Sequence, residues 1–266
     1  MIELAPNHKI GLALPNPIMI AAGFCGFGDA YERLIDLTFF GGLITGPITL
    51  RPNRGSPQPR LVETPAGFIL NTGLQNPGVR SVIKHYRQRW TRLGRPVIAH
   101  LPAAEPDDLK RTARALSSLG ALAGLELGLP PGVGPYELEL WLRAIRADSE
   151  LPLLVKLPLG SDPELAAVAV EQGADALVIG AAPLGAARSP RSGQTVSGQL
   201  YGPALHSLAL RDLRNLQHLD VPRVASGGIH SAADVKAFLE AGAKAVQLDS
   251  LLLIDPQAAQ RLATAY

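Results

Sequence analysis

The chain has 266 residues, of which 47% are hydrophobic and 18% are charged, and its formal net charge is +2. A charged fraction below the ~25% of average soluble domains indicates a large buried core and excludes disorder as the dominant state. So small a net charge excludes a protein that binds nucleic acid mainly by neutralising its phosphates.

Short apolar runs alternate with longer amphipathic segments along the whole chain, which is the pattern of repeated strand–helix units. The predicted strands cover residues 17–22, 42–45, 96–101, 122–127, 152–157, 176–180, 223–226 and 245–248. The predicted helices cover residues 29–37, 79–93, 107–119, 136–147, 163–172, 204–219, 232–240 and 256–265. Ser231 is the expected N-cap of the helix at 232–240, with Asp234 completing a capping box.

Eight strands in alternation with eight helices predict an α/β fold, a (β/α)8 TIM barrel that forms a single domain over residues 1–266. A doubly wound open sheet is the alternative, because residues 21–28 (AAGFCGFG) loosely match the glycine-rich turn after its first strand. That fold also places an acidic residue at the end of the second strand, where this chain has Thr45 and Gly46. The barrel is therefore favoured.

Two long connections interrupt the alternation, at 47–78 after the second strand and at 181–202 after the sixth. Each follows a strand, so we expect both over the C-terminal mouth of the barrel, where barrel enzymes bind their ligands. Long connections without secondary structure are usually lids or binding loops.

Neither a membrane segment nor a metal centre is predicted. Residues 10–28 are uncharged, but Pro15, Asn16 and Pro17 interrupt any helix there, and no other stretch approaches the ~20 apolar residues of a span. The single cysteine, Cys25, excludes an internal disulfide and an iron–sulfur centre, and the histidines and carboxylates lack metal-ligand spacing. We expect a soluble, cytoplasmic protein.

Two side chains at predicted strand ends could carry chemistry. Lys156 ends the fifth strand among aliphatic residues, where an ammonium is costly to bury unless it meets an anion or hydrogen-bond acceptors. It either faces a ligand or extends its amine to solvent at the rim. His100 ends the third strand and is either a general acid or base or a hydrogen-bonded core histidine.

A candidate phosphate site follows the seventh and eighth strands, as is usual in TIM barrels. Gly227 and Gly228 would let the backbone approach an anion closely, although an ordinary turn also explains them. Asp249 opposes an anion, since its carboxylate would repel phosphate. Elsewhere, Asn71 and Thr72 could hydrogen-bond a planar ligand or simply shape a turn.

In combination, several segments resemble the soluble class 1 dihydroorotate dehydrogenases, which are FMN-dependent (β/α)8 barrels. The similar segments are 16–23 (NPIMIAAG), 63–67 (ETPAG), 73–78 (GLQNPG), 155–157 (VKL), 173–176 (GADA), 202–205 (GPAL), 208–211 (LALR), 226–234 (SGGIHSAAD) and 241–243 (AGA). The resemblance implies an oxidoreductase of pyrimidine biosynthesis. Such an enzyme oxidises dihydroorotate to orotate, passing a hydride to FMN while a cysteine after the fourth strand takes a proton.

The resemblance also implies site residues. Asn71 and Thr72 would face the substrate, and Lys156 would lie near N1 of the flavin ring. The full set of implied cofactor-binding positions is Ala21, Ala22, Gly23, Lys156, Gly202, Gly227, Gly228 and Ser250. The expected partners are a small-molecule ligand and a second copy of the chain; an electron-transfer subunit is compatible with the sequence but not indicated by it.

The departures from the family pattern lie in the catalytic part. Where the family has Asn-hydrophobic-Ser-Cys-Pro-Asn, residues 126–131 read ELGLPP, without the cysteine. Gly46 replaces a lysine, Leu70 an asparagine and Asp249 a glycine, and residues 179–183 lack an expected asparagine. Because a positioned base contributes ~10²–10⁴-fold in rate, we expect weak or no oxidation of dihydroorotate.

Three hypotheses stay open. The first is a flavin oxidoreductase of this family with altered or impaired activity. The second is a non-catalytic barrel with a binding or regulatory role and weak or no FMN binding, which Gly46 and Asp249 favour. The third is an enzyme of altered substrate, in which His100 replaces the missing base and Lys156 orients an anionic ligand.

Overall fold

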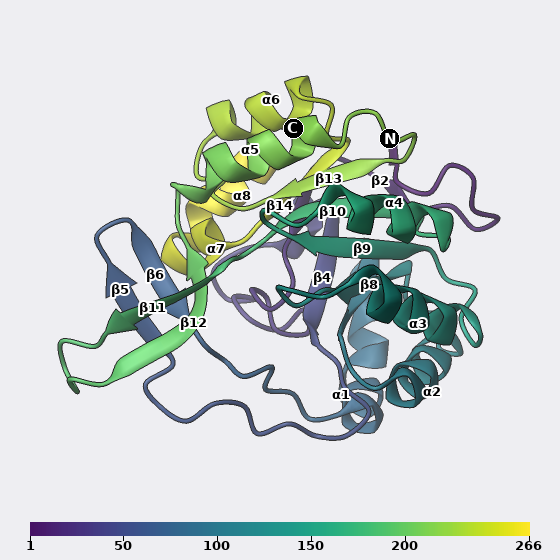
Figure 1. Cartoon of the computed structure of the whole chain (residues 1–266), viewed down its shortest axis with the longest axis horizontal. Coiled ribbons are helices and arrows are strands. Elements are labelled where there is room, and N and C mark those ends of the chain that lie inside the picture. The colour runs from purple at the N-terminus through teal and green to yellow at the C-terminus, as the bar shows by residue number, and fades with distance from the viewer.

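The computed structural model describes residues 1–266 and shows eight parallel strands that hydrogen-bond in a closed ring (Figure 1). In chain order the strands are β3 (Ile18–Ile20), β4 (Gly42–Pro47), β7 (Val97–Pro102), β8 (Gly124–Gly128), β9 (Leu153–Pro158), β10 (Ala176–Ala181), β13 (Arg223–Ser226) and β14 (Ala245–Leu248). Each pairs with the next, and β14 closes the ring on β3. The predicted TIM barrel is confirmed, because a doubly wound sheet would leave two open edges.

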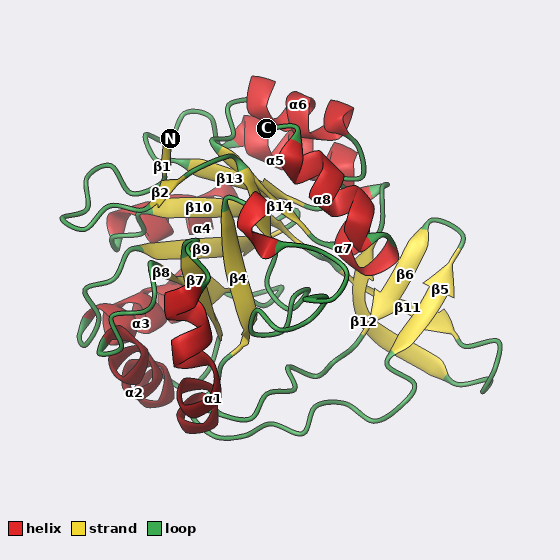
Figure 2. Cartoon of the chain, turned by 180° about the vertical axis from the view of Figure 1, so that it is seen from behind, coloured by secondary structure: helices red, strands yellow, loops and turns green.

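Helices follow seven of the eight strands and surround the barrel (Figures 1 and 2). They are α1 (Val79–Arg92), α2 (Pro106–Ser117), α3 (Pro135–Arg146), α4 (Pro163–Glu171), α5 (Leu205–Asn215), α6 (Ala232–Glu240), the short α7 (Ser250–Ile254) and α8 (Pro256–Thr264). The predicted capping box of α6 is confirmed: the Ser231 hydroxyl accepts from the Asp234 N–H, and the Asp234 carboxylate accepts from the Ser231 N–H. No helix combines the length and the apolar character that crossing a bilayer requires.

The predicted helix at 29–37 is wrong. This segment forms turns, followed only by a short 3-10 helix, η1 (Leu37–Phe39). Backbone φ is positive at Gly26, Gly28 and Tyr31, and a right-handed helix cannot contain such residues. The Asp29 carboxylate accepts hydrogen bonds from the Phe27 N–H and the Tyr86 hydroxyl, so it joins this loop to α1 instead of starting a helix.

The expectation that the two long connections lack secondary structure is also wrong. They pair with each other in one antiparallel sheet beside the barrel (Figure 2). The first connection supplies β5 (Leu61–Thr64) and β6 (Gly67–Leu70), and the second supplies β11 (Leu184–Arg188) and β12 (Thr195–Tyr201), in the order β11-β12-β6-β5. Close approach depends on Gly67, where a Cβ would lie 1.9 Å from the Tyr201 carbonyl oxygen.

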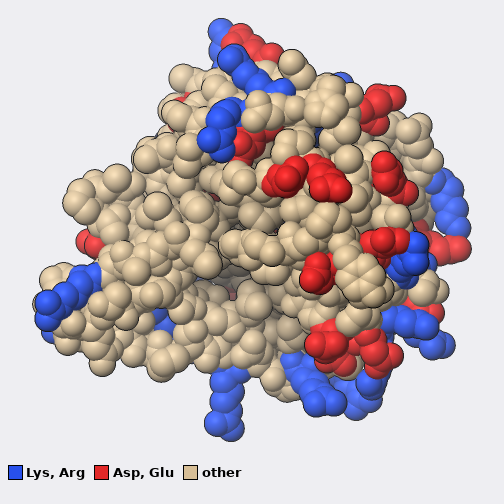
Figure 3. All heavy atoms as spheres, viewed as in Figure 1, with Lys and Arg blue, Asp and Glu red and all other residues tan.

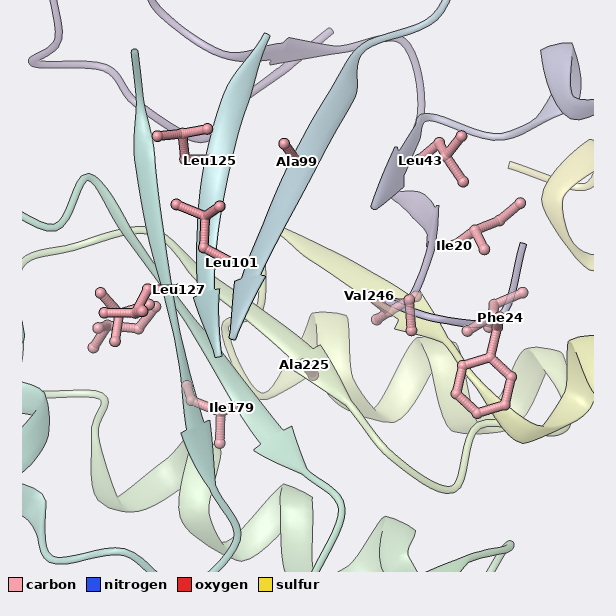
Figure 4. Packing of buried hydrophobic residues seen from close by; sticks show 14 of the residues in the cluster. Ile20, Phe24, Leu43, Ala99, Leu101, Leu125, Leu127, Ile179, Ala225 and Val246 are labelled. Carbon is pink, nitrogen blue, oxygen red and sulfur yellow. The ribbon is translucent and has the colours of Figure 1, made fainter. Parts of the chain in front are cut away.

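The side chains that point outward from the barrel strands pack against the helices in one large apolar cluster. Leu101, Leu125 and Leu127 belong to this cluster and are completely buried (Figure 4). Because successive residues of a strand face opposite sides, the residues between them face the barrel interior.

The barrel interior changes from apolar to polar along the strands. At the N-terminal ends, a second apolar cluster includes Met19, Ile44, Ile98, Leu154, Val178, Val224 and Ala245. The N-terminal hairpin of β1 (Ile2–Glu3) and β2 (Ala13–Leu14) packs on this cluster through Leu4, Leu12 and Leu14. Two positions further along β7, β9, β13 and β14 stand the polar side chains His100, Lys156, Ser226 and Gln247, and Glu126 lies at the same level on β8, as the register partner of His100. The fold thus places a polar layer below the C-terminal mouth.

Candidate active site

A cavity of about 640 Å³ opens at this mouth, between the barrel and the antiparallel sheet. Its volume is within the ~300–1,000 Å³ range of small-molecule sites. Figure 3 shows a hollow in this face whose surroundings are mostly uncharged. Among the predicted site residues, the lining includes Ala21, Ala22, Gly23, Asn71, Thr72, His100 and Lys156. Lys156 is the only Lys or Arg that lines the cavity, and Asp249 is the only Asp or Glu.

The polar layer is one continuous hydrogen-bonded chain across the barrel. The Lys156 ammonium donates to Gln247 Oε1 at 2.8 Å and to Ser226 Oγ at 3.3 Å. Gln247 Nε2 donates to Glu126 Oε2 at 2.6 Å, and Glu126 Oε1 lies 2.9 Å from His100 Nδ1. Lys156 thus meets acceptors at the mouth, as its position at a strand end predicted.

Glu126 is completely buried, yet it carries a charge. Burial alone would raise the pKa of this carboxyl group, but the Lys156 charge and the hydrogen bonds from His100 and Gln247 outweigh burial and hold the pKa below its usual value. Glu126 is therefore ionised at neutral pH, and its charge balances that of Lys156. Sequence reasoning treated Glu126 only as a departure from a motif and missed this role.

His100 lies beside Glu126 because the two residues are register partners on β7 and β8. An ionised carboxylate can only accept hydrogen bonds, so the hydrogen bond to Glu126 places the imidazole proton on Nδ1. In the neutral ring Nε2 carries the lone pair, and Nε2 has no hydrogen-bond partner in the protein. The side chain is 12% exposed and lines the cavity, so an unpaired basic nitrogen stands at its wall.

Gly128 makes room for this imidazole. A Cβ at Gly128 would lie 2.5 Å from His100 Cε1 and 2.9 Å from His100 Nε2, closer than real Cβ contacts. The same holds for any larger residue at this position, because every one carries a Cβ. The ring position at His100 therefore depends on glycine two residues after Glu126.

The predicted phosphate residues lie beside the cavity rather than in its wall. Gly202, Gly227, Gly228 and Ser250 do not line it, whereas their neighbours Tyr201, Ser226 and Asp249 do. Gly227 and Gly228 are buried, and their backbone N–H groups donate to no acceptor in the protein. Because an unpaired buried donor costs about 1–3 kcal/mol, these two N–H groups are suited to an anionic acceptor.

Asp249 competes with an anion at this corner. Its carboxylate accepts hydrogen bonds from the backbone N–H and the hydroxyl of Ser250. His230 Nε2 lies 2.9 Å from the same hydroxyl, and burial lowers the pKa of His230 in spite of the nearby carboxylates Asp249 and Asp234. The corner thus contains a carboxylate and a largely neutral imidazole, which opposes the binding of phosphate.

Asn71 and Thr72 differ in their availability to a ligand. Asn71 accepts hydrogen bonds from the Ser56 hydroxyl and the Gly73 N–H, and donates one to the Ser197 carbonyl on β12. These contacts join the loop after β6 to the antiparallel sheet and occupy the Asn71 amide. The exposed Thr72 hydroxyl makes no hydrogen bond to the protein.

Cys25 lies outside the cavity lining and is completely buried. Burial, reinforced by Asp29, raises the pKa of its thiol to about 12, and its Sγ donates to the Ala30 carbonyl at 3.4 Å. A thiol that stays protonated behind the cavity wall cannot take a proton from a ligand.

Comparisons with known proteins agree with the barrel fold. The family model for dihydroorotate dehydrogenase matches residues 6–264. A protein of Desulforudis audaxviator (strain MP104C) named "Dihydroorotate dehydrogenase B (NAD(+)), catalytic subunit" is 34% identical over 270 residues, covering 95% of this chain and 88% of the relative. The protein of the same name from Bacillus pumilus (strain SAFR-032) is 31% identical, covering 92% and 85%. A crystal structure of DHODH from Eimeria tenella in complex with ferulenol shares the fold, with a TM-score of 0.77 at 21% identity over 99% of this chain and 85% of that one.

Proposed function

The chain belongs to the dihydroorotate dehydrogenase family, and from this premise we propose that it is a flavin-dependent oxidoreductase with FMN bound at the barrel mouth. The observation that carries the proposal is the cavity of about 640 Å³ directly above Lys156 and the polar layer. A cation at this depth favours a ligand that gains electron density, as a flavin ring does on reduction.

The cavity suits the flavin ring better than it suits the phosphate. Ala21, Ala22 and Gly23 present only small side chains to the cavity and leave space for a flat ring. Gly227 and Gly228 offer two buried N–H groups to phosphate oxygens. When bound, FMN would supply the acceptor for a hydride.

We propose that oxidation of dihydroorotate by this chain is weak or absent. Leu129, Pro130 and Pro131 line the cavity where the family resemblance expects a cysteine and an asparagine. Dihydroorotate also carries a carboxylate, and the only cation in the lining is Lys156, whose charge Glu126 already balances. The lining therefore has neither the cysteine that the family resemblance expects nor an uncommitted cation for this substrate.

The second candidate function is a non-catalytic barrel with a binding or regulatory role and weak or no FMN binding. The contact between the Asp249 carboxylate and Ser250 favours it, because this carboxylate competes with phosphate for the Ser250 N–H and hydroxyl groups. Gly46 also lines the cavity without the cation that the family resemblance expects there.

The visible absorption spectrum of freshly purified protein tests the flavin proposal. A flavin spectrum, or a melting temperature that rises with added FMN, supports it, since saturation at 100 Kd adds about 2.7 kcal/mol of stability. Colourless protein with an unchanged melting temperature refutes flavin binding and leaves the second candidate. Robust orotate formation from dihydroorotate would refute the proposed impairment.

We also propose that a second protein accepts electrons from this chain. The relatives are named as catalytic subunits, which supports a multi-subunit assembly. With a single buried cysteine, this chain cannot hold an iron–sulfur cluster of its own. Purification of this chain from its native host, together with any protein that stays bound to it, tests this partner. The bound protein should speed reoxidation of the reduced flavin.

A further inference from the structure

We propose that His100 is the general base of this site and that Glu126 is its positioning residue. His100 Nε2 takes a proton from a carbon next to a carbonyl group, in an uncharged substrate. The inference deepens the proposed function, since it names the base of the same site. It rests on the proposed function only in that a bound flavin would accept the hydride.

The first argument is the direction of the imidazole. Glu126 uses one carboxylate oxygen for His100 and the other for Gln247, so the carboxylate is held from both sides. This arrangement keeps the imidazole proton on Nδ1 and the lone pair on Nε2, at the cavity wall. A buried carboxylate that orients a histidine also stabilises the imidazolium that forms when Nε2 takes a proton.

The second argument is that the replacements on β8 form one arrangement with His100. The position of the expected asparagine is Glu126, which holds the ring, and the position of the expected serine is Gly128, which makes room for it. The position of the expected cysteine is Leu129, which has no titratable group. The proton acceptor has therefore moved from the loop after β8 to the neighbouring strand β7.

The third argument compares the ionisable groups of the lining. The Lys156 ammonium donates to Gln247 and Ser226, and Asp249 accepts from Ser250 through Oδ1 alone. Burial and the nearby Asp249 raise the pKa of Tyr201, which keeps that phenol protonated. Among the ionisable groups of the lining, His100 Nε2 and Asp249 Oδ2 are the basic atoms without a hydrogen-bond partner, and His100 is the one that a buried carboxylate orients.

The charges of the cavity define the substrate class. Glu126 neutralises Lys156, and Asp249 adds a negative charge, so an anionic substrate would find no uncommitted cation. An uncharged cyclic amide or ketone fits this balance. We therefore favour an uncharged substrate over the anionic ligand that Lys156 would orient.

The proton step balances as follows. The substrate C–H bond next to the carbonyl breaks, an N–H bond forms at His100 Nε2, and the electron pair is left as an enolate shared between carbon and the carbonyl oxygen. When bound, FMN would accept the hydride that leaves the adjacent carbon, and the electron pair of the enolate would then form the C=C bond. The proton leaves His100 to water when product departs.

Nuclear magnetic resonance of protein labelled with ¹⁵N-histidine tests the geometry without flavin or substrate. Long-range ¹H–¹⁵N spectra show which ring nitrogen carries the proton, and the His100 signals are those lost in His100→Gln. We expect the proton on Nδ1 in the wild type. In Glu126→Gln the amide can donate to Nδ1, so we expect the proton on Nε2. His85→Gln is the matched control, since His85 is exposed on α1, outside the cavity lining, and its ring nitrogen hydrogen-bonds only to Ser81.

Deuterium exchange at C5 of 5,6-dihydrouracil in D₂O tests the base, with dihydroorotate as the comparison that differs only by its carboxylate. We expect exchange by the wild type and by His85→Gln, and a loss of ~100-fold or more in His100→Gln. Gly128→Ala should lower exchange as well, because the added Cβ displaces the ring. Dihydroorotate should exchange at least about tenfold more slowly than dihydrouracil.

Three results would overturn the inference: a proton on Nε2 in the wild type, no exchange by the wild type, or unchanged exchange in His100→Gln. Equal exchange of the two compounds would refute the substrate class. Failure of the proposed function looks different, because a chain that does not bind FMN would still show the tautomer and the exchange. Conversely, a yellow protein without exchange would retain the proposed function and lose the base.

Discussion

Removing Glu126 alone should destabilise the protein more than removing Glu126 together with Lys156. The Glu126 carboxylate is completely buried and accepts two hydrogen bonds, and Lys156 is 9% exposed. In Glu126→Leu the buried ammonium loses the charge that balances it. Breaking a buried pair in this way costs about 3–5 kcal/mol, so we expect a loss of that size in the free energy of unfolding.

The double variant Glu126→Leu/Lys156→Met removes both charges. It still leaves the Gln247 amide without its two partners, and an unsatisfied buried polar group costs about 1–3 kcal/mol. We therefore expect the double variant to be about 2 kcal/mol more stable than Glu126→Leu. Contacting residues commonly show coupling energies of 0.5–3 kcal/mol, so the effect is measurable.

Urea unfolding of the four proteins at neutral pH, followed by circular dichroism and tryptophan fluorescence, gives the coupling energy directly. The four proteins of this double-mutant cycle are the wild type, Glu126→Leu, Lys156→Met and the double variant. Additive losses, with the double variant as unstable as the sum of both singles, would refute the reasoning that Gln247 links the two charges into one unit. They would also remove the charge balance from which the substrate class was inferred.

Three further predictions concern acid stability, the lone thiol and the phosphate corner. The pKa of Glu126 in the folded protein lies below its ordinary value near 4.5, so the charge of Glu126 contributes fully to stability above that pH. This contribution is lost as the pH falls through the pKa of the folded state. Urea titrations should therefore show that the difference in free energy of unfolding between wild type and Glu126→Leu becomes smaller on acidification. Because burial raises the pKa of Cys25 to about 12, an aromatic disulfide reagent should react with it only on unfolding, and Cys25→Ala should leave FMN binding unchanged; rapid labelling of native protein would contradict this. Asp249→Asn should bind FMN about tenfold more tightly, equivalent to about 1.4 kcal/mol, while riboflavin, which has no phosphate, should be unaffected in fluorescence titrations. Equal gains for both flavins would show that Asp249 acts on the ring rather than on the phosphate.

The barrel was predictable because its signals are local. Every barrel strand is an apolar run between turn residues, and the bounds at Arg223–Ser226 and Ala245–Leu248 agree with the prediction. The antiparallel sheet was not predictable in this way, because β6 pairs with β12 from a distant part of the chain. The false helix at 29–37 failed at Tyr31, whose positive φ is rare for a residue with a side chain and leaves no pattern in the sequence.

In the site, too, residues with a local sequence signal were predictable and contacts between distant strands were not. Lys156 was identifiable as a lone charge in an aliphatic strand, and Ala21, Ala22 and Gly23 were placed by resemblance and line the cavity. Glu126 gave a comparable signal, a lone carboxylate between leucines on a strand, but its partners come from β7 and β14. Only closure of the ring brings β14 across from β8, so the chain from Lys156 to His100 could not be derived from spacing.

Stability alone does not explain the polar layer. An interior filled with apolar side chains of similar volume is often as stable as a buried ion pair or more so, and the layer below it is filled in that way by residues such as Ile98 and Leu154. Polar groups that cost stability are expected where a site needs them. On β8 two positions serve His100. Glu126 binds one of its ring nitrogens, and the absence of a side chain at Gly128 leaves space for the other nitrogen at the cavity. An inactive barrel would not need a glycine at position 128 to keep His100 Nε2 at the cavity. The arrangement therefore favours an enzyme of altered activity over an inactive protein.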